Sequence, residues 1–193
     1  MRSPRDRMVM SAALLIRERG ARATAIADVL AHSGAPRGSA YHHFPGGRTQ
    51  LLCEAVDLAG EHIAALIAEA HSGLELLDTL IDKYREQLLA TEFRAGCPIA
   101  AVSVEAGFDQ DDRDRMAPVV QRAAAAFDRW SELITQRFVA DGIDSQRAGE
   151  LAELATATLE GALLLARVRR DLAPLDLVHR QLRELLERNL PHE

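Results

Sequence analysis

The chain has 193 residues, of which 48% are hydrophobic and 4% aromatic, and a formal net charge of −6. No apolar run reaches the roughly 18 residues of a membrane span, and the start, MRSPRDRM, lacks an apolar core of signal-peptide length. We therefore expect a cytoplasmic protein without a membrane partner. Two widely separated cysteines, Cys53 and Cys97, argue against a disulfide framework or a metal cluster, and we expect both thiols to be reduced.

The charge is unevenly distributed along the chain. Residues 1–50 contain eight arginines and three acidic residues, a formal charge of +5, which leaves −11 for the remainder. This asymmetry is expected when one end of a protein meets phosphate, although helical surfaces also carry solvated charges without such a role. Abundant alanine and leucine favour an all-α protein. The length allows one domain or a small module on a larger one, and we favour the second.

The first predicted helix spans about residues 4–19 and ends at Gly20. Its apolar residues share one face: Met8, Ala12, Leu15 and Ile16. We expect this helix to serve as a platform for a short helix that follows, because isolated segments of that length are marginal in water.

Residues 24–44, TAIADVLAHSGAPRGSAYHHF, combine two short apolar-patterned segments with a glycine-centred break. Gly34 suits a tight turn, and Pro36 fits the first turn of a second helix predicted over Pro36–His43. Two residues at its end can point inward: Ala40 and Phe44. Two short helices around a glycine turn make a helix-turn-helix, whose second helix enters the major groove by its amino end.

Three residues at the amino end of that second helix are predicted to face base edges. Arg37 can donate two hydrogen bonds to one guanine, and Ser39 can bond several bases. Gly38 lets the backbone approach DNA closely. The sequence therefore predicts a DNA-reading element.

Four further residues are predicted to contact phosphates. Thr24, Tyr41 and His42 can donate to phosphate oxygens, which fixes register without reading sequence. Arg48 lies near the amino end of a helix predicted over Gly47–Ala70, where the helix partial charge also favours a phosphate. This helix is expected to join the DNA-reading module to the rest of the protein.

The run TAIADVLAHSGAPRGSAYHHFPGGRTQL resembles the DNA-binding signature of TetR-family transcriptional repressors. HHFPGG, GCPIAAVSVEAG at 96–107 and EGALLLARVRRD at 160–171 are similar to the branch that includes the LmrA and YxaF regulators. The resemblance implies about nine helices, with a DNA-binding domain over 1–46 and a ligand-binding and dimerisation domain over 47–193. One departure is the segment Gly46-Gly47-Arg48, which replaces the usual Ser-Lys helix start with one extra residue and arginine for lysine.

The remaining helices are predicted from apolar spacing and from breaks in the chain. One begins after Ser72-Gly73, a short one begins at Pro98 and ends at Gly107, and a long one spans about 111–140. Asp144 or Ser145 caps the next helix, and Pro174 starts the last. The helix after Asp144 carries apolar residues on more than one side, and the last helix carries one apolar seam, which favours a homodimer through a four-helix interface of these two helices and their symmetry mates. The family resemblance implies the same interface.

The resemblance also implies a pocket for a small apolar or aromatic effector. The candidate lining residues are Tyr84, Phe93, Cys97, Val102, Phe108, Met116, Phe127 and Trp130. Aromatic and methionine residues at helical spacing also form plain core, so both roles stay open for each. Glu105 and Glu160 lie in apolar sequence and could orient a ligand, pair with an arginine or be exposed.

The predicted function is a ligand-responsive transcriptional repressor that binds palindromic operator DNA as a dimer and is released by its effector. An enzyme would need a nucleophile with its base, a metal set or a phosphate loop, and we identify none of these in the sequence. No cofactor is expected. The alternative is a helical protein-interaction module whose basic end meets an acidic partner. Salt dependence of duplex binding and a preference for one DNA sequence would separate the two.

Overall fold

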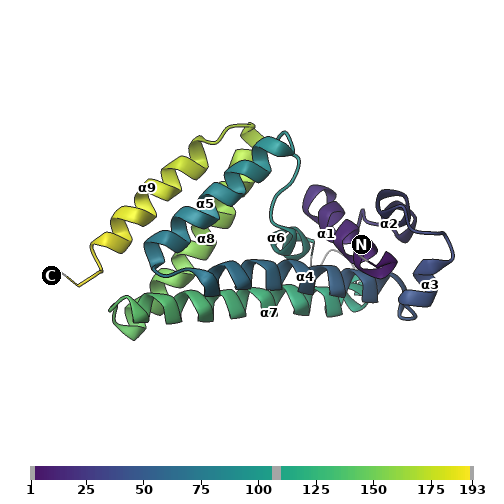
Figure 1. The fold of residues 1–193 in the computed structure, drawn as a ribbon, viewed down its shortest axis with the longest axis horizontal. Helices are drawn as coiled ribbons and strands as arrows, with labels where there is room; N and C mark the ends of the chain where they lie inside the picture. The colour runs from purple at the N-terminus through teal and green to yellow at the C-terminus, as the bar shows by residue number, and fades with distance from the viewer. Residues whose placement is uncertain (1–2, 106–109, 192–193) are drawn as a thin grey trace. The chain divides into compact units, whose positions relative to one another are not determined.

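The computed structural model describes residues 3–105 and 110–191, and every regular element within these ranges is a helix (Figure 1). The helices are α1 Pro4–Arg19, α2 Ile26–Ser33, α3 Ser39–His43, α4 Gly47–Glu69, α5 Gly73–Ala90, α6 Pro98–Val104, α7 Gln110–Ala140, α8 Ser145–Arg169 and α9 Ala173–Glu187. The prediction of an all-α protein is confirmed. No helix within the described ranges is both long enough and apolar enough to cross a membrane.

The chain forms two compact units, each made from two separate stretches of sequence. The first contains Met1–Glu61 and Cys97–Phe127, and the second contains His62–Gly96 and Asp128–Glu193. This division does not coincide with the predicted boundary after residue 46, because α4 and α7 each begin in the first unit and end in the second. The boundary between a DNA-binding and a ligand-binding domain stays a prediction.

Helix α1 is the element against which the other short helices of the first unit pack. Ser3 caps it by accepting a bond from the Asp6 backbone N–H at 3.1 Å, and Pro4 occupies its first turn, where a missing N–H costs nothing. Its buried face contacts α2, α3 and α6. The buried residues are Met8, Val9, Ser11, Ala12, Ala13, Leu15 and Ile16. This arrangement confirms the predicted platform.

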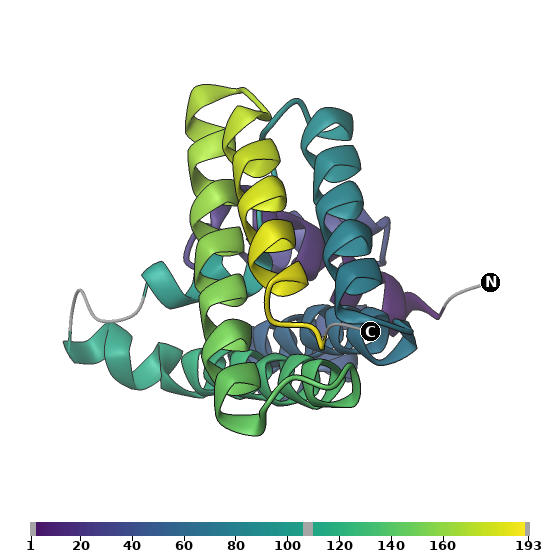
Figure 2. The same cartoon turned by 90° about the vertical axis from the view of Figure 1, so that its left-hand side faces the viewer.

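Helices α5, α8 and α9 of the second unit lie side by side (Figures 1 and 2). The Asp78 carboxylate of α5 accepts bonds from Arg183 of α9 at 2.8 Å, and it lies 2.7 Å from Nε2 of His179. At the start of α5, a Cβ on Gly73 would stand 2.6 Å from the Phe138 ring, so only glycine fits this close approach to α7. These contacts fix the spacing of the helices around the interior of the second unit.

The described helix ends agree with the sequence in most places and differ at the start of α3. Asp144 caps α8 by accepting bonds from the N–H groups of Gln146 and Arg147, as predicted. Helix α3 begins at Ser39, three residues later than predicted, because Pro36 heads a tight turn in which its carbonyl accepts from the Ser39 N–H at 3.0 Å. Helix α6 ends at Val104, and the predicted end at Gly107 lies outside the described residues.

Candidate nucleic-acid interface and cavity

A tight glycine turn joins α2 to α3. Gly34 ends α2 in the left-handed conformation, with φ of 64° and ψ of 22°, which favours glycine over residues with a Cβ. Pro36 and Gly38 then lead into α3 through the turn that closes on Ser39. Two short helices and the five residues between them form the helix-turn-helix that the sequence predicted.

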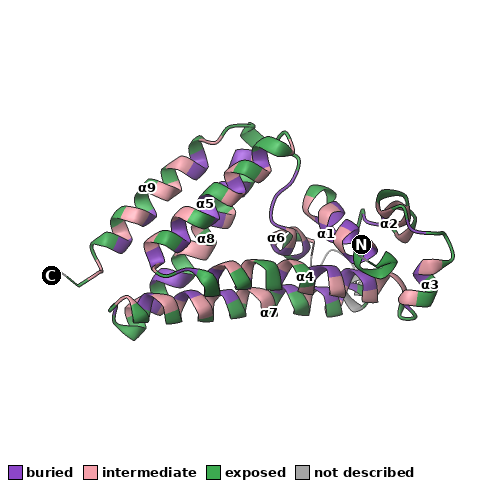
Figure 3. Cartoon of the chain, viewed as in Figure 1, coloured by how far each residue is buried: buried purple, intermediate pink, exposed green. Residues whose placement is uncertain are grey.

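Helix α3 presents polar side chains to solvent. Figure 3 shows it mostly exposed or half-buried. Tyr41 is 75% exposed, and Arg37, Gly38 and His42 are exposed as well. Ser39 is half-buried, and its hydroxyl donates to the Pro36 carbonyl at 2.7 Å, so that hydroxyl already has a local acceptor. Of the residues predicted to read or grip DNA, Arg37, Gly38, Tyr41 and His42 are therefore the accessible ones.

The opposite face of α3 is anchored in the first unit. Ala40 and Phe44 are each 1% exposed, which confirms that they point inward. The Arg5 guanidinium of α1 lies 5.4 Å from the centre of the Phe44 ring, within the range of a cation–π contact. Helix α3 and Phe44 at its end are thus held on α1 by apolar burial and by the cation–π contact of Arg5.

Thr24 and Arg48 have structural uses that differ from the predicted phosphate contacts. Thr24 is 1% exposed, and its hydroxyl donates to the Gly20 carbonyl at 2.8 Å. Arg48 donates through Nε to the Thr24 carbonyl at 2.9 Å and through a terminal nitrogen to the carbonyls of Ala21 and Arg22. In this structure the Thr24 hydroxyl is buried away from any DNA, and the Arg48 guanidinium holds the loop between α1 and α2.

Helix α6 reaches the same loop from a distant part of the sequence. The carboxylate of Glu105, which follows α6, accepts a bond from the Arg22 backbone N–H at 3.0 Å. Glu105 is half-buried in the first unit and has this local role, so it is not a member of the cavity described next. The loop that precedes α2 is therefore held from two sides, by α4 through Arg48 and by the residue that ends α6.

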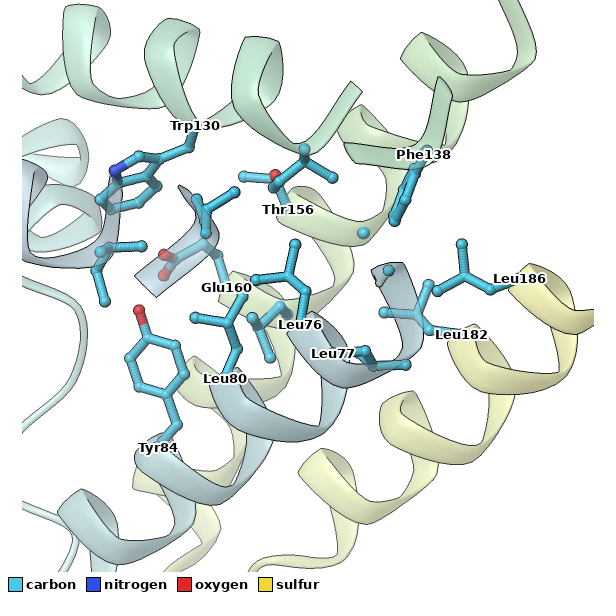
Figure 4. A pocket seen from close by; sticks show the side chains of 16 residues that line it. Leu76, Leu77, Leu80, Tyr84, Trp130, Phe138, Thr156, Glu160, Leu182 and Leu186 are labelled. Atoms are coloured by element: carbon cyan, nitrogen blue, oxygen red, sulfur yellow. The ribbon is translucent and has the colours of Figure 1, made fainter. Parts of the chain in front are cut away.

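An apolar cavity of about 50 Å³ lies inside the second unit (Figure 4). Its wall contains side chains of α4, α5, α7, α8 and α9, most of them aliphatic or aromatic. Residues labelled in Figure 4 are Leu76, Leu77, Leu80, Tyr84, Trp130, Phe138, Thr156, Glu160, Leu182 and Leu186. A volume of this size has room for about one or two water molecules, so a ligand that contains a ring must widen it.

Large apolar side chains are exposed on α8 and α9. They are Leu154, Leu164, Leu165, Val168 and Leu177. Val168 is 78% exposed, and a groove between the two helices is lined by Leu154, Val178 and Leu185. Several apolar residues together on adjoining helices are typical of a surface that another protein covers.

Protein-family models match both parts of the chain. The model of bacterial regulatory proteins of the tetR family matches residues 10–55, and that of the LmrA/YxaF-like transcriptional regulator C-terminal domain matches residues 73–181. The chain belongs to the TetR family. This family consists of transcriptional regulators and is not a family of enzymes.

Relatives and solved structures of TetR-family proteins agree with this assignment. An uncharacterized HTH-type transcriptional regulator of Mycobacterium tuberculosis H37Rv is 78% identical over 191 residues, covering 99% of this chain and 98% of that protein. LmrA, an HTH-type transcriptional regulator of Bacillus subtilis, is 27% identical over a match that covers 95% of this chain and 97% of LmrA. A TetR regulator from Legionella pneumophila matches the fold alone, with a TM-score of 0.80, 20% identity and 99% coverage of both chains. A TetR transcriptional regulator from Chloroflexus aurantiacus has a TM-score of 0.71 at 29% identity, and the match covers 97% of this chain and 96% of that protein.

The effector residues predicted for this TetR-family chain fall into four groups. Tyr84 and Trp130 line the cavity, and Phe93 is half-buried in the turn after α5 and is not part of the wall. Phe108 lies outside the described residues. The remaining four belong to the first unit, three of them buried and Phe127 half-buried: Cys97, Val102, Met116 and Phe127.

Several cavity residues were not predicted. Leu76, Leu80 and Thr156 carry no sequence signal that separates them from ordinary helix core. Glu160 was weighed as a ligand-orienting residue, and the structure places it in the cavity wall. A polar residue in an otherwise apolar helical stripe was therefore a more useful signal of a cavity residue than the apolar residues of the stripe themselves.

Proposed function

We propose that this TetR-family regulator is a repressor that binds palindromic operator DNA as a homodimer and is released by a small, largely apolar effector. The observation that carries the proposal is the exposure of Arg37, in the turn before α3, and of Tyr41 and His42 on α3, in a helix-turn-helix with a buried inner face. A recognition helix needs this combination, because its outer side chains must reach base edges while its inner face stays fixed.

The exposed apolar residues of α8 and α9 support the homodimer. A second copy of the same surface would cover them and form a four-helix interface around a twofold axis. Two recognition helices related by that axis would engage two half-sites one helical turn apart or a multiple of it. Binding through both half-sites raises affinity because the second contact is intramolecular.

The cavity in the second unit supports the proposal that a small effector binds there and releases the protein from DNA. Helices α4 and α7 both continue from the unit that carries the helix-turn-helix into the unit that carries the cavity. A molecule that widens the cavity favours a different packing of α4, α5, α7, α8 and α9. If that packing binds DNA less well, linkage requires the effector and the operator to weaken each other by the same factor.

Fluorescence anisotropy with the DNA upstream of the protein's own gene tests the proposal. We expect salt-sensitive binding that prefers one inverted repeat over bulk DNA. Arg37→Ala should weaken binding to this repeat by about tenfold to a hundredfold, and Tyr41→Phe should weaken it less. Arg94→Ala removes an exposed arginine of the second unit and is the matched control.

Two outcomes would overturn the proposal. One is an absence of duplex binding even at low salt. The other is binding that Arg37→Ala and Tyr41→Phe leave unchanged, which would favour a protein-interaction module with a basic end. Selection of genomic fragments with the purified protein would then show whether any inverted repeat is enriched.

A further inference from the structure

We infer that the cavity selects an apolar molecule with one hydrogen-bond-donating head group, an ammonium or a hydroxyl, and discriminates against a carboxylate. The inference rests on the proposed effector role of the cavity and adds the chemistry of the effector. It follows from which groups line the wall and from the state of one buried hydroxyl.

The cavity wall contains one carboxylic acid and no basic side chain. Glu160 is the single charged residue among those that line the cavity in the described part of the chain. The other side chains are mostly leucine, isoleucine and aromatic rings, which offer an apolar body no polar partner. A head group that donates a hydrogen bond would meet an acceptor at Glu160, whereas an anionic head would meet a like charge where water is scarce.

Thr156 supplies an independent observation. Its hydroxyl oxygen is buried in the protein and has no hydrogen-bond partner among the described residues. Thr156 lies one helical turn before Glu160 on α8, and both residues line the cavity. Buried polar groups in folded proteins are nearly always paired, so a hydroxyl left open in a cavity wall points to a polar group that arrives with a ligand.

The polar side chains of the wall gather at one end of the cavity. Figure 4 shows Tyr84 and Trp130 on either side of the Glu160 carboxylate, with all three directed into the same end of the cavity. The carboxylate makes this end electronegative, and the apolar side chains of α5 and α9 form the opposite end.

A matched series of small probes tests the inference. The probes 2-phenylethylammonium, 2-phenylethanol and phenylacetate share one ring, so each must widen the cavity of about 50 Å³ to a similar extent, and they differ in the head group. Trp130 is the one tryptophan of the chain, so its fluorescence reports binding without DNA. We expect both donor probes to bind more tightly than phenylacetate, with at least a tenfold advantage, roughly, for the ammonium.

Two variants assign the selectivity to the wall. Glu160→Gln keeps the size of the side chain and removes its charge, so the advantage of the ammonium over phenylacetate should fall to about threefold or less. Thr156→Val removes the unpaired hydroxyl at constant shape. It should raise the melting temperature by roughly 2–4 °C and yet weaken the donor probes, a pair of opposite effects that a purely structural role would not produce.

The inference is overturned if phenylacetate binds as tightly as the ammonium, if Glu160→Gln leaves the order and ratio unchanged, or if neither donor probe binds up to its solubility limit. These fluorescence measurements use no DNA. Failure of the proposed repressor function would appear separately, as a loss of operator binding in the absence of any probe.

Discussion

The Nε group of Arg48 donates a hydrogen bond to the Thr24 carbonyl at 2.9 Å, across the gap between the start of α4 and the loop before α2. The same guanidinium donates to the carbonyls of Ala21 and Arg22. A planar guanidinium can satisfy several carbonyls from one position, whereas an ammonium on a flexible stem cannot reproduce that geometry. Arg48 therefore fixes the loop that precedes the first helix of the helix-turn-helix, α2.

This contact predicts how Arg48 variants bind the operator. Arg48→Ala and Arg48→Lys should weaken binding to a similar extent, because both lose the fixed arrangement of the loop. The slope of log affinity against log salt should change by less than about one unit, since the loss is not that of a phosphate contact. Anisotropy titrations at several salt concentrations measure both quantities. Retained affinity in Arg48→Lys, with a slope reduced by about one in Arg48→Ala, would restore the phosphate contact that the sequence suggested.

The exposed apolar residues of α8 and α9 predict the effect of a charge at the proposed dimer surface. Val168→Glu and Leu165→Glu should each shift the protein toward a monomer, because the dimer would bury an unpaired carboxylate. Sedimentation equilibrium measures the shift. Leu89→Glu is the control, since Leu89 is 55% exposed on α5 and is not part of this surface. A dimer that tolerates the two α8 substitutions as well as the control would place the interface elsewhere.

Asp78 predicts a dependence of stability on pH. Burial opposes its ionisation, but hydrogen bonds from His179 and Arg183 outweigh that cost and lower the pKa of the carboxyl below its ordinary value. A lowered folded-state pKa stabilises the protein above the unfolded pKa of about 4, and this contribution is lost as pH falls through the folded-state pKa. Its size should be below about 1 kcal/mol, because the side chain is 42% exposed.

Urea titrations of wild-type protein and Asp78→Asn at pH 7 and pH 3 measure this contribution. The wild type should be the more stable protein at pH 7, and the difference should shrink toward zero at pH 3. Asp82→Asn is the control, because Asp82 is 74% exposed and lies 3.9 Å from its nearest arginine nitrogen. A difference between wild type and Asp78→Asn that grows as pH falls would contradict the assigned direction.

The backbone conformation of Gly34 predicts how much folding stability is lost when this residue is substituted. Its φ of 64° is left-handed, and no atom lies within 4 Å of the place that a Cβ would occupy. Gly34→Ala should therefore lose only conformational energy, about 1 kcal/mol, and Gly34→Asn should lose less. Gly38→Ala is the matched control, since its position is equally open and its φ is −78°. Equal losses at Gly34 and Gly38 in urea unfolding would show that φ does not set the cost.

Helix positions were predictable wherever a stripe of apolar residues coincided with a chemical start and stop signal. Helix α1 has a proline in its first turn, one apolar face and a glycine at its end, and the structure places it at Pro4–Arg19 as predicted. The start of α3 was less predictable, because Pro36 is compatible both with the first turn of a helix and with the tight turn that precedes one. Local chemistry alone does not separate these two uses.

The wall of the cavity could be predicted only in part. The choice of aromatic and methionine residues selected Tyr84 and Trp130 correctly, but it also selected Met116 and Phe127, which lie in the first unit. Membership of the wall depends on which helices meet, and Leu80 and Leu186 come together from positions more than a hundred residues apart. The role of Arg48 was hidden for a related reason, because backbone carbonyls that accept hydrogen bonds leave no mark on a sequence.

The bond between Glu105 and the Arg22 backbone N–H joins residues that are 83 positions apart. During synthesis, the amino-terminal helices leave the ribosome long before residue 105 is made. The loop before α2 therefore lacks this partner until more than half of the chain has been translated. Contacts of such long range are slow to form, so the DNA-reading end should mature late even though it is made first.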